Sequence, residues 1–132
     1  RALGTDFPSL AREVGHDPLS VNAPGSAAGV WSSTAGSRAI LQVATLGSPS
    51  AELWEWTLQP GDRYDAQPDP AGSQELFFVI TGQLTIEVTG VDAVVVNAGG
   101  SARLASDRLY SYQNDGRRAT RFVRVVQLGS TP

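Results

Sequence analysis

The sequence contains no cysteine, no methionine and no lysine, and its one histidine is His16. Without cysteine there is no disulfide framework, and this fits a reducing compartment, so we predict a cytoplasmic location. Thiolate and imidazole are the donors that transition metals prefer, so the chain has almost nothing from which to build such a site. Because the chain starts at Arg1 and lacks methionine, we also expect further residues upstream.

The chain also has little net charge and no long apolar run. Its 132 residues include 10 basic and 13 acidic side chains, which gives a formal net charge of -3. Phosphate binding needs a concentrated cationic face, so we do not expect these residues to bind nucleic acid. The arginines between positions 117 and 124 are interpreted as a solvated strand face. No apolar segment approaches the roughly 18 residues of a membrane helix, so no membrane partner is expected.

The first 36 residues differ in pattern from the rest. Residues 6–15 start with an aspartate, carry an early proline and close on a glycine, which predicts a short helix. Residues 22–36 are rich in small and turn-forming residues and predict a linker, with a short extended piece at 29–31. His16 beside Asp17 lacks the nucleophile of a catalytic pair. We therefore predict a helix and linker over 1–36 and one domain over 37–132.

From residue 38 onward the chain reads as short strands separated by turns. Glycine and proline punctuate it at 59–62, 81–83 and 97–100, where turns need special backbone angles. The predicted strands are 39–46, 51–58, 74–80, 83–89, 92–96, 101–104, 110–114 and 120–128. This spacing is typical of an antiparallel sandwich or barrel, so the fold class is all-β and the architecture a jelly roll.

Two segments carry the spacing of a known pair of motifs. The first has its frame at Gly61, Gln67, Asp69, Glu75 and Gly82. The second is the turn 98–100 followed by the segment 106–114, which ends in Tyr112-Gln113-Asn114. Residues 38–128 therefore resemble the cupins, and among them the sensor domain that follows a helix-turn-helix in XRE-type bacterial transcriptional regulators. The resemblance implies a cupin jelly-roll β-barrel, also called a double-stranded β-helix.

The resemblance implies a metal site made of three histidines and one glutamate. Of these ligands the sequence retains Glu75, while Gln67 and Asp69 stand where the first motif has histidines. One glutamate and one aspartate are a poor donor set for a transition metal. We therefore predict no metal, no cofactor and no metal-dependent activity.

Alternate residues of a strand share one face, so Glu75 and Phe77 belong together, as do Tyr110 and Tyr112. The resemblance implies that both faces look into the barrel, where they would line a pocket for a small organic molecule. The predicted ligand-binding residues are Gln67, Glu75, Phe77, Tyr110, Tyr112 and Arg124.

Two of the candidate side chains keep two interpretations. Glu75 either contacts ligand or is satisfied by internal partners, because leaving it unpaired would be costly. Arg124 alternates with apolar residues on its strand, so it either pairs with Glu75 or an anionic ligand, or extends to solvent at the barrel mouth or a subunit interface. Trp54, like Trp56, is expected in core or dimer packing.

Three functions follow as hypotheses. The first is an effector-binding, homodimeric domain of a transcriptional regulator that contacts DNA only through a helix-turn-helix outside this chain; it assigns no catalytic residue. The second is a metal-free isomerase, epimerase or lyase that uses Glu75 with Tyr110 or Tyr112 as an acid/base pair. The third is a barrel with a filled interior that serves only as a dimerisation scaffold.

Overall fold

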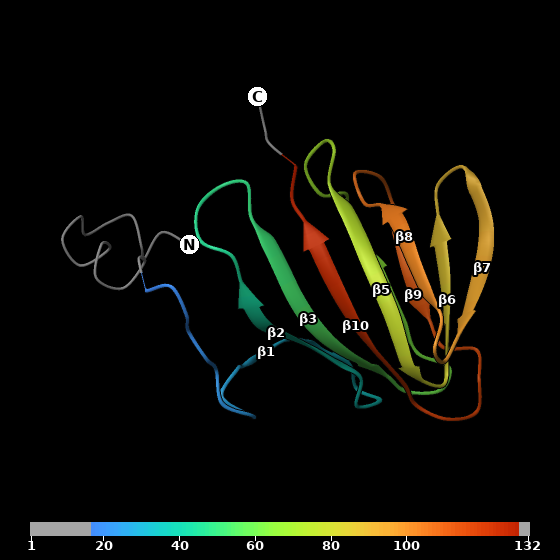
Figure 1. Cartoon of the computed structure of the whole chain (residues 1–132). Helices are drawn as coiled ribbons and strands as arrows, with labels where there is room; N and C mark the ends of the chain where they lie inside the picture. Colours follow the sequence, from blue (N-terminus) through green and yellow to red (C-terminus); the bar gives the residue numbers. More distant parts are fainter. Residues whose placement is uncertain (1–16, 130–132) are drawn as a thin grey trace.

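The structure, a computed structural model, describes residues 17–129 and is all-β over that range, with no helix. The predicted helix at 6–15 and His16 lie outside the described residues. The strands are β1 (Gly29–Ser32), β2 (Arg38–Ala44), β3 (Ala51–Leu58), β4 (Arg63–Ala66), β5 (Gln74–Thr81), β6 (Gln83–Val88), β7 (Val91–Asn97), β8 (Ser101–Ala105), β9 (Tyr110–Gln113) and β10 (Thr120–Gln127). Figure 1 shows the strands running side by side between loops at the two ends of the molecule. The all-β prediction is confirmed.

The strands form two antiparallel sheets. The six-stranded sheet has the order β1-β2-β3-β10-β5-β8, and the four-stranded sheet has the order β4-β9-β6-β7. Strands far apart in the sequence are neighbours in both sheets, as β10 lies between β3 and β5 (Figure 1). This arrangement places the inward faces of β5, β9 and β10 around one interior.

The predicted strands correspond to β2, β3 and β5 to β10, with bounds that agree to within two residues. The extended piece expected at 29–31 is β1, which pairs with β2. Sequence reasoning missed β4, because its four residues are too few to show a clear alternation. Pairing with β9 holds this short strand in place. The division of the chain near residue 36 stays a prediction.

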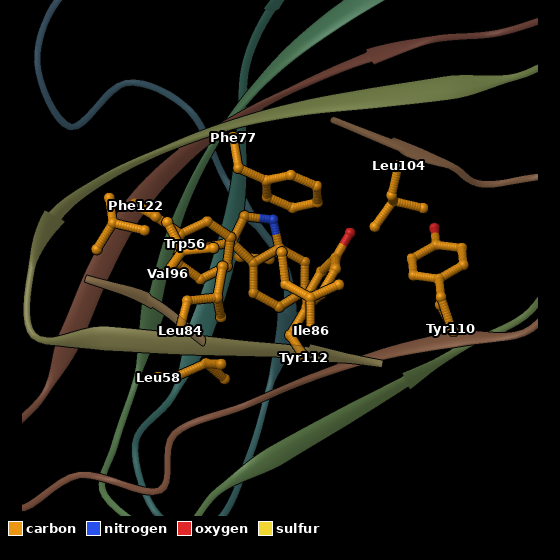
Figure 2. Close-up of a cluster of buried hydrophobic side chains, with 13 residues drawn as sticks. Trp56, Leu58, Phe77, Leu84, Ile86, Val96, Leu104, Tyr110, Tyr112 and Phe122 are labelled. Atoms are coloured by element: carbon orange, nitrogen blue, oxygen red, sulfur yellow. The ribbon is translucent and has the colours of Figure 1, made fainter. Parts of the chain in front are cut away.

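The interior is filled mainly by aromatic and aliphatic side chains. Trp56, Tyr112 and Phe122 are 1%, 0% and 0% exposed. The rings of Trp56 and Phe122 stack at 5.6 Å between centroids, and Tyr112 meets both edge-on. Figure 2 shows these rings packed among Leu58, Leu84 and other apolar side chains. Burial of each such side chain stabilises the fold by about 1.5–3 kcal/mol, so this cluster holds the two sheets together.

A glycine turn and a buried asparagine close the end of the barrel where β5 turns into β6. Gly82 has a φ of 78°, and a Cβ there would lie 2.8 Å from the carbonyl oxygen of Ala119, so the turn requires glycine. Asn114 is fully buried and donates to the carbonyls of Leu58 and Arg118 at 2.9 Å and 2.8 Å. These contacts tie the turns of this end together and leave the opposite end for the site.

Candidate functional site

A pocket of about 380 Å³ opens at the other end of the barrel, where β10 ends and β5 begins. Each of seven strands contributes at least one side chain to its wall: Trp31 of β1, Ala39 of β2, Trp54 of β3, Tyr64 of β4, Glu75 of β5, Tyr110 of β9 and Arg124 of β10. The pocket exists because the inward alternation of both sheets brings these distant segments to one mouth.

The structure brings together four of the six predicted ligand-binding residues in this wall: Gln67, Glu75, Tyr110 and Arg124. Phe77 and Tyr112 do not line the pocket. They are 3% and 0% exposed and lie in the core beneath it. The interior of the barrel is therefore filled with side chains, and the hollow lies at its mouth.

Glu75 is the centre of a buried hydrogen-bond network. The phenol of Tyr110 donates to Glu75 Oε2 at 2.7 Å, and the phenol of Tyr112 donates to Glu75 Oε1. Arg124 Nη1 donates to the Tyr112 hydroxyl at 2.9 Å and lies 3.8 Å from Glu75 Oε2. Glu75 is 1% exposed. Its carboxylate is thus internally paired, as one of the two interpretations expected, and it also forms part of the pocket wall.

Arg124 is held between this carboxylate and two tryptophans. Its guanidinium carbon lies 4.8 Å from the ring centroid of Trp54 and 5.0 Å from that of Trp56. The register explains this, because Arg124 is the β10 partner of Trp54 on β3. Cation–π contact of this kind contributes about 0.5–2 kcal/mol. Arg124 is 6% exposed, and the structure shows it paired with Glu75.

Burial governs the protonation of the network. It raises the pKa of Glu75, and the charge of Arg124 and the bonds from the two tyrosines only partly oppose this. Burial also raises the pKa of Tyr110 and of Tyr112 far above the usual value of 10.0, so both phenols keep the protons that they donate. Burial opposes the Arg124 cation, but Tyr112 and Glu75 outweigh it and raise its pKa.

The residues present do not fit the divalent metal that cupin barrels commonly hold. Both oxygens of Glu75 already accept a bond from a tyrosine, and a guanidinium lies 3.8 Å from one of them. A metal ion at this carboxylate would have to displace those donors and lie beside a fixed positive charge. Within the range 17–129, no three histidine, cysteine, aspartate or glutamate residues are grouped so as to hold a metal ion.

Sequence reasoning missed the aromatic part of the wall. Trp31 and Tyr64 were not singled out, and Trp54 was expected in the core or an interface. Trp54 is half-buried and faces the pocket, because the pairing of β3 with β10 puts it beside Arg124. The only signal in the sequence was the spacing of Trp54 and Trp56, which places both on one face of a strand but does not show whether that face points into the barrel.

The wall is also acidic. Four carboxylates line it, from Glu52, Asp65, Asp69 and Glu75, against the one guanidinium of Arg124. Asp65 is paired with Arg63 at 2.7 Å, and Glu75 with Arg124. Burial raises the pKa of Asp69, whose Oδ2 is buried without a hydrogen-bond partner among residues 17–129. Glu52 and Asp69 form no salt bridge within the part of the chain that the structure describes, so the mouth keeps uncompensated negative charge.

A larger hollow of about 640 Å³ is lined by residues of the four-stranded sheet and its loops, and it shares Asp65, Gln67 and Tyr110 with the pocket at the mouth. Three of its four charged side chains are already engaged, since Arg63 pairs with Asp65 at 2.7 Å and with Glu87 at 3.1 Å, and the fourth, Asp92, forms no salt bridge within residues 17–129. It touches neither Glu75 nor Arg124, so the pocket at the mouth is the better candidate site. In addition, residues 17–129 include no helix that is long and apolar enough to cross a membrane.

No protein-family model matches the chain, and no curated protein matches it in sequence. Several solved structures match the chain in fold. The Cupin_2 domain of an XRE-family transcriptional regulator from Enterobacter cloacae aligns with a TM-score of 0.57 and 24% identity, covering 61% of this chain and 83% of that one.

A predicted oxalate decarboxylase from Thermotoga maritima aligns with a TM-score of 0.60 and 18% identity, over 84% of this chain and 100% of that one. An HTH_3-family transcriptional regulator from Vibrio cholerae aligns with a TM-score of 0.59 and 17% identity over 70% of this chain. The match spans 52% of the Vibrio chain, about half its length. The sheet order, the filled interior and these likenesses together establish that the chain has the cupin fold, the jelly-roll β-barrel that the sequence resemblance implied.

Proposed function

We propose that this protein is a small-molecule-binding cupin domain and that its ligand is an organic cation held at the mouth of the barrel. The observation that carries this proposal is the composition of the pocket wall. The aromatic side chains of Trp31, Trp54 and Tyr64 line the pocket together with carboxylates that outnumber the single guanidinium. Aromatic faces and carboxylates both attract positive charge, and a concave pocket with a few polar groups is the usual form of a small-molecule site.

The charges support a cation over an anion. Arg124 is the one cationic side chain in the wall, and Glu75 neutralises it at 3.8 Å. Glu52 uses one oxygen to accept a bond from Trp54 Nε1 at 3.0 Å and forms no salt bridge within residues 17–129. A cation that enters therefore meets Glu52 and Asp69 without displacing an internal partner, whereas an anion would be repelled by both. The wall of the pocket already holds one cation, Arg124, against Trp54.

The likeness to the Enterobacter and Vibrio proteins supports a regulatory role for this binding. In this proposal the protein is the cytoplasmic sensor domain of a transcriptional regulator, and residues outside this chain contact DNA. Ligand binding regulates only if it stabilises one arrangement of the regulator more than another, because equal affinity shifts no equilibrium. The DNA-contacting part of the proposal is tested by the gene, which must encode a helix-turn-helix next to this domain.

Calorimetry with matched probes tests the ligand class. Choline and its uncharged carbon isostere 3,3-dimethylbutan-1-ol differ in charge but hardly in shape. We expect choline to bind about 10-fold more tightly, because a desolvated cation–π contact is worth on the order of 1–2 kcal/mol. Tetramethylammonium and a linear diamine extend the panel to smaller and longer cations.

Matched variants locate the binding. Glu52→Gln and Trp54→Leu remove a charge and a ring from the wall, and each is expected to weaken choline binding about 10-fold. Glu87→Gln removes a charge from the outer surface and serves as the control with unchanged affinity. Equal affinity for the isostere, or tighter binding of organic anions such as benzoate than of every cation in the panel, would show that the ligand class is wrong.

A metal-free enzyme is the second candidate, and one observation favours it. Glu75 and Tyr110 both line the pocket, lie 2.7 Å apart and have pKa values raised by burial, which suits a carboxyl group that transfers a proton to or from a bound molecule. Turnover of a bound compound that is lost in Glu75→Gln while its affinity is kept would support this function. Binding without turnover of any ligand would support the sensor alone.

A further inference from the structure

Strand β1 is the outermost strand of the six-stranded sheet and pairs with β2 alone. Three of its four residues have partners on β2, and the register shifts between Gly29 and Trp31. By contrast, all eight residues of β10 pair with β3. A short edge strand with an interrupted ladder opens locally at lower cost than a central strand. β1 is therefore easier to detach from the sheet than β3 or β10, although all three strands contribute to the pocket wall.

One side chain, that of Trp31, joins β1 to the interior of the barrel. The other three residues of β1 are exposed, whereas Trp31 is half-buried and packs against the core. Its ring centroid lies 5.4 Å from that of Trp56 and 5.1 Å from that of Tyr64. Trp31 also lines the pocket, so the same indole holds β1 in place and forms part of the proposed binding surface.

The two ends of β1 are held differently. Directly after the strand, the hydroxyl of Ser33 donates to the carboxylate of Asp62. Before the strand, residues 17–28 are almost entirely exposed, and one hydrogen bond, from Asn22 Nδ2 to the carbonyl of Gln42 at 2.9 Å, joins them to the rest of the described chain. Figure 1 shows β1 and this stretch on the side of the molecule away from β7. β1 is thus held at the end that continues into the barrel and little restrained at the other.

We propose that ligand binding at the mouth holds β1 against the barrel, and that this strand connects occupancy of the pocket to the residues that precede it in the chain. The inference rests on the proposed function and adds the regulation of that site. A cation in the pocket gains contact with Trp31 only while β1 is attached. Because the ligand binds the attached state more tightly than the detached state, it shifts the equilibrium toward attachment.

The position of β1 in the chain gives this equilibrium its consequence. β1 is the first strand of the described residues, so whatever precedes it is connected to the barrel through this strand. An attached β1 fixes the direction in which the chain enters the barrel, and a detached β1 leaves that direction free. The strands that carry Glu75, Tyr110 and Arg124 are paired on both sides, so these residues supply affinity without moving the start of the barrel.

Hydrogen exchange of the whole chain, followed by mass spectrometry with and without saturating choline, tests the coupling. Loss of one desolvated cation–π contact weakens binding about 10-fold, so the detached state is expected to bind choline about 10-fold less tightly. We therefore expect the amides of residues 29–32 to exchange about 10-fold more slowly in the complex. The amides of β7, an edge strand outside this pocket, are expected to exchange at an unchanged rate.

A matched pair of variants separates the coupling from folding. Coupling is reciprocal, so Trp31→Leu is expected to lose the same factor of about 10 in choline affinity and to abolish the effect of choline on residues 29–32. Ser32→Ala changes an exposed side chain of the same strand that does not line the pocket, and it is expected to keep both properties. Unchanged exchange within β3 and β10 establishes that each variant is folded.

The outcomes distinguish this inference from the proposed function. Choline binding that leaves the exchange of residues 29–32 unchanged, or a Trp31→Leu variant with the affinity of the wild type, would overturn the coupling while the binding site stands. Absence of binding by every cation in the panel would overturn the proposed function, and this inference with it.

Discussion

The two ends of the barrel interior are built from different side chains although the same strands run through both. At the closed end β5 and β10 contribute Val79 and Phe122, which are fully buried among apolar neighbours. At the open end, on the same inward faces, they contribute Glu75 and Arg124. Side chains alternate between the inward and outward faces in the same way at both ends, so the two ends differ only in the chemistry of their inward side chains.

The comparison teaches where the fold gains stability and where it carries a site. The closed end gains from apolar burial and stacked rings. A buried ion pair such as that of Glu75 and Arg124 is weak evidence for stability, because desolvation of both charges offsets their attraction. The open end is thus the part of the interior whose composition is explained better by binding than by folding.

The largest effect is expected at the closed end. Phe122→Ala removes a ring that stacks on Trp56 at 5.6 Å and contacts Phe77, so we expect a loss of about 3–5 kcal/mol in the free energy of unfolding. Urea denaturation measures it. Leu109→Ala is the control, since Leu109 is 56% exposed and its truncation is expected to cost less than about 0.5 kcal/mol. Equal costs for the two variants would remove the distinction between core and surface.

The next effect is expected from breaking the ion pair. Arg124→Met leaves Glu75 buried beside two phenols without its cation, and we expect a loss of about 3 kcal/mol. The double variant Glu75→Gln with Arg124→Met is expected to recover most of this loss, because the network then contains no charge. A double variant as unstable as the single one would show that the pair itself stabilises the fold.

The loss of stability in Arg124→Met is expected to depend on pH. Arg124 is the strongest influence that opposes the raised pKa of Glu75, so its removal raises that pKa further. A carboxyl group whose pKa is higher in the folded than in the unfolded state favours folding when it is protonated, and its cost grows as the pH rises above its ordinary value of 4.5. The deficit of Arg124→Met is therefore expected to shrink as the pH is lowered toward 4.5 and below.

A smaller effect on stability, with the opposite dependence on pH, is expected at the turn between β3 and β4. Hydrogen bonds from Ser33 and Ser37 hold the pKa of Asp62 below its ordinary value of 3.8. The ionised form thus contributes stability at neutral pH that is lost as the pH falls below 3.8. Asp62→Asn is expected to cost about 1 kcal/mol at pH 7, as for a lost hydrogen bond, and less at pH 2. Guanidinium denaturation at both pH values measures this.

The smallest effect on stability is expected at the pocket wall, where the effect on binding is large. Trp54 is half-buried, and Trp54→Leu is expected to lower the free energy of unfolding by less than about 1 kcal/mol while it weakens cation binding. Cation affinity is also expected to rise with pH through the raised pKa of Asp69, because the ionised carboxylate attracts the ligand. A cation affinity that is constant between pH 4 and pH 8 would exclude Asp69 from the site.

Much of the fold follows from local patterns in the sequence. Period-two alternation and the glycine and proline turns located the strands β2, β3 and β5 to β10, and the motif spacing implied the cupin fold. The candidate site followed only in part. Gln67, Glu75, Tyr110 and Arg124 line the pocket, whereas Phe77 and Tyr112 lie beneath it, and ligand binding by these residues stays a prediction. Alternation gives the face of a residue and leaves open its depth within the barrel.

The sequence by itself determined most of the strand segments, which side chains share a face, and that the histidines of a cupin metal site are missing. Tertiary structure alone decided that Arg124 lies between Glu75 and Trp54 and that aromatic side chains from β1, β3 and β4 meet at one mouth. It also decided that the outward apolar residues of β5 continue across β10 and β3. The physical reason is that alternation is a property of a few consecutive residues. Partnership across a sheet depends instead on the register between strands that are far apart in the chain, and packing sets that register.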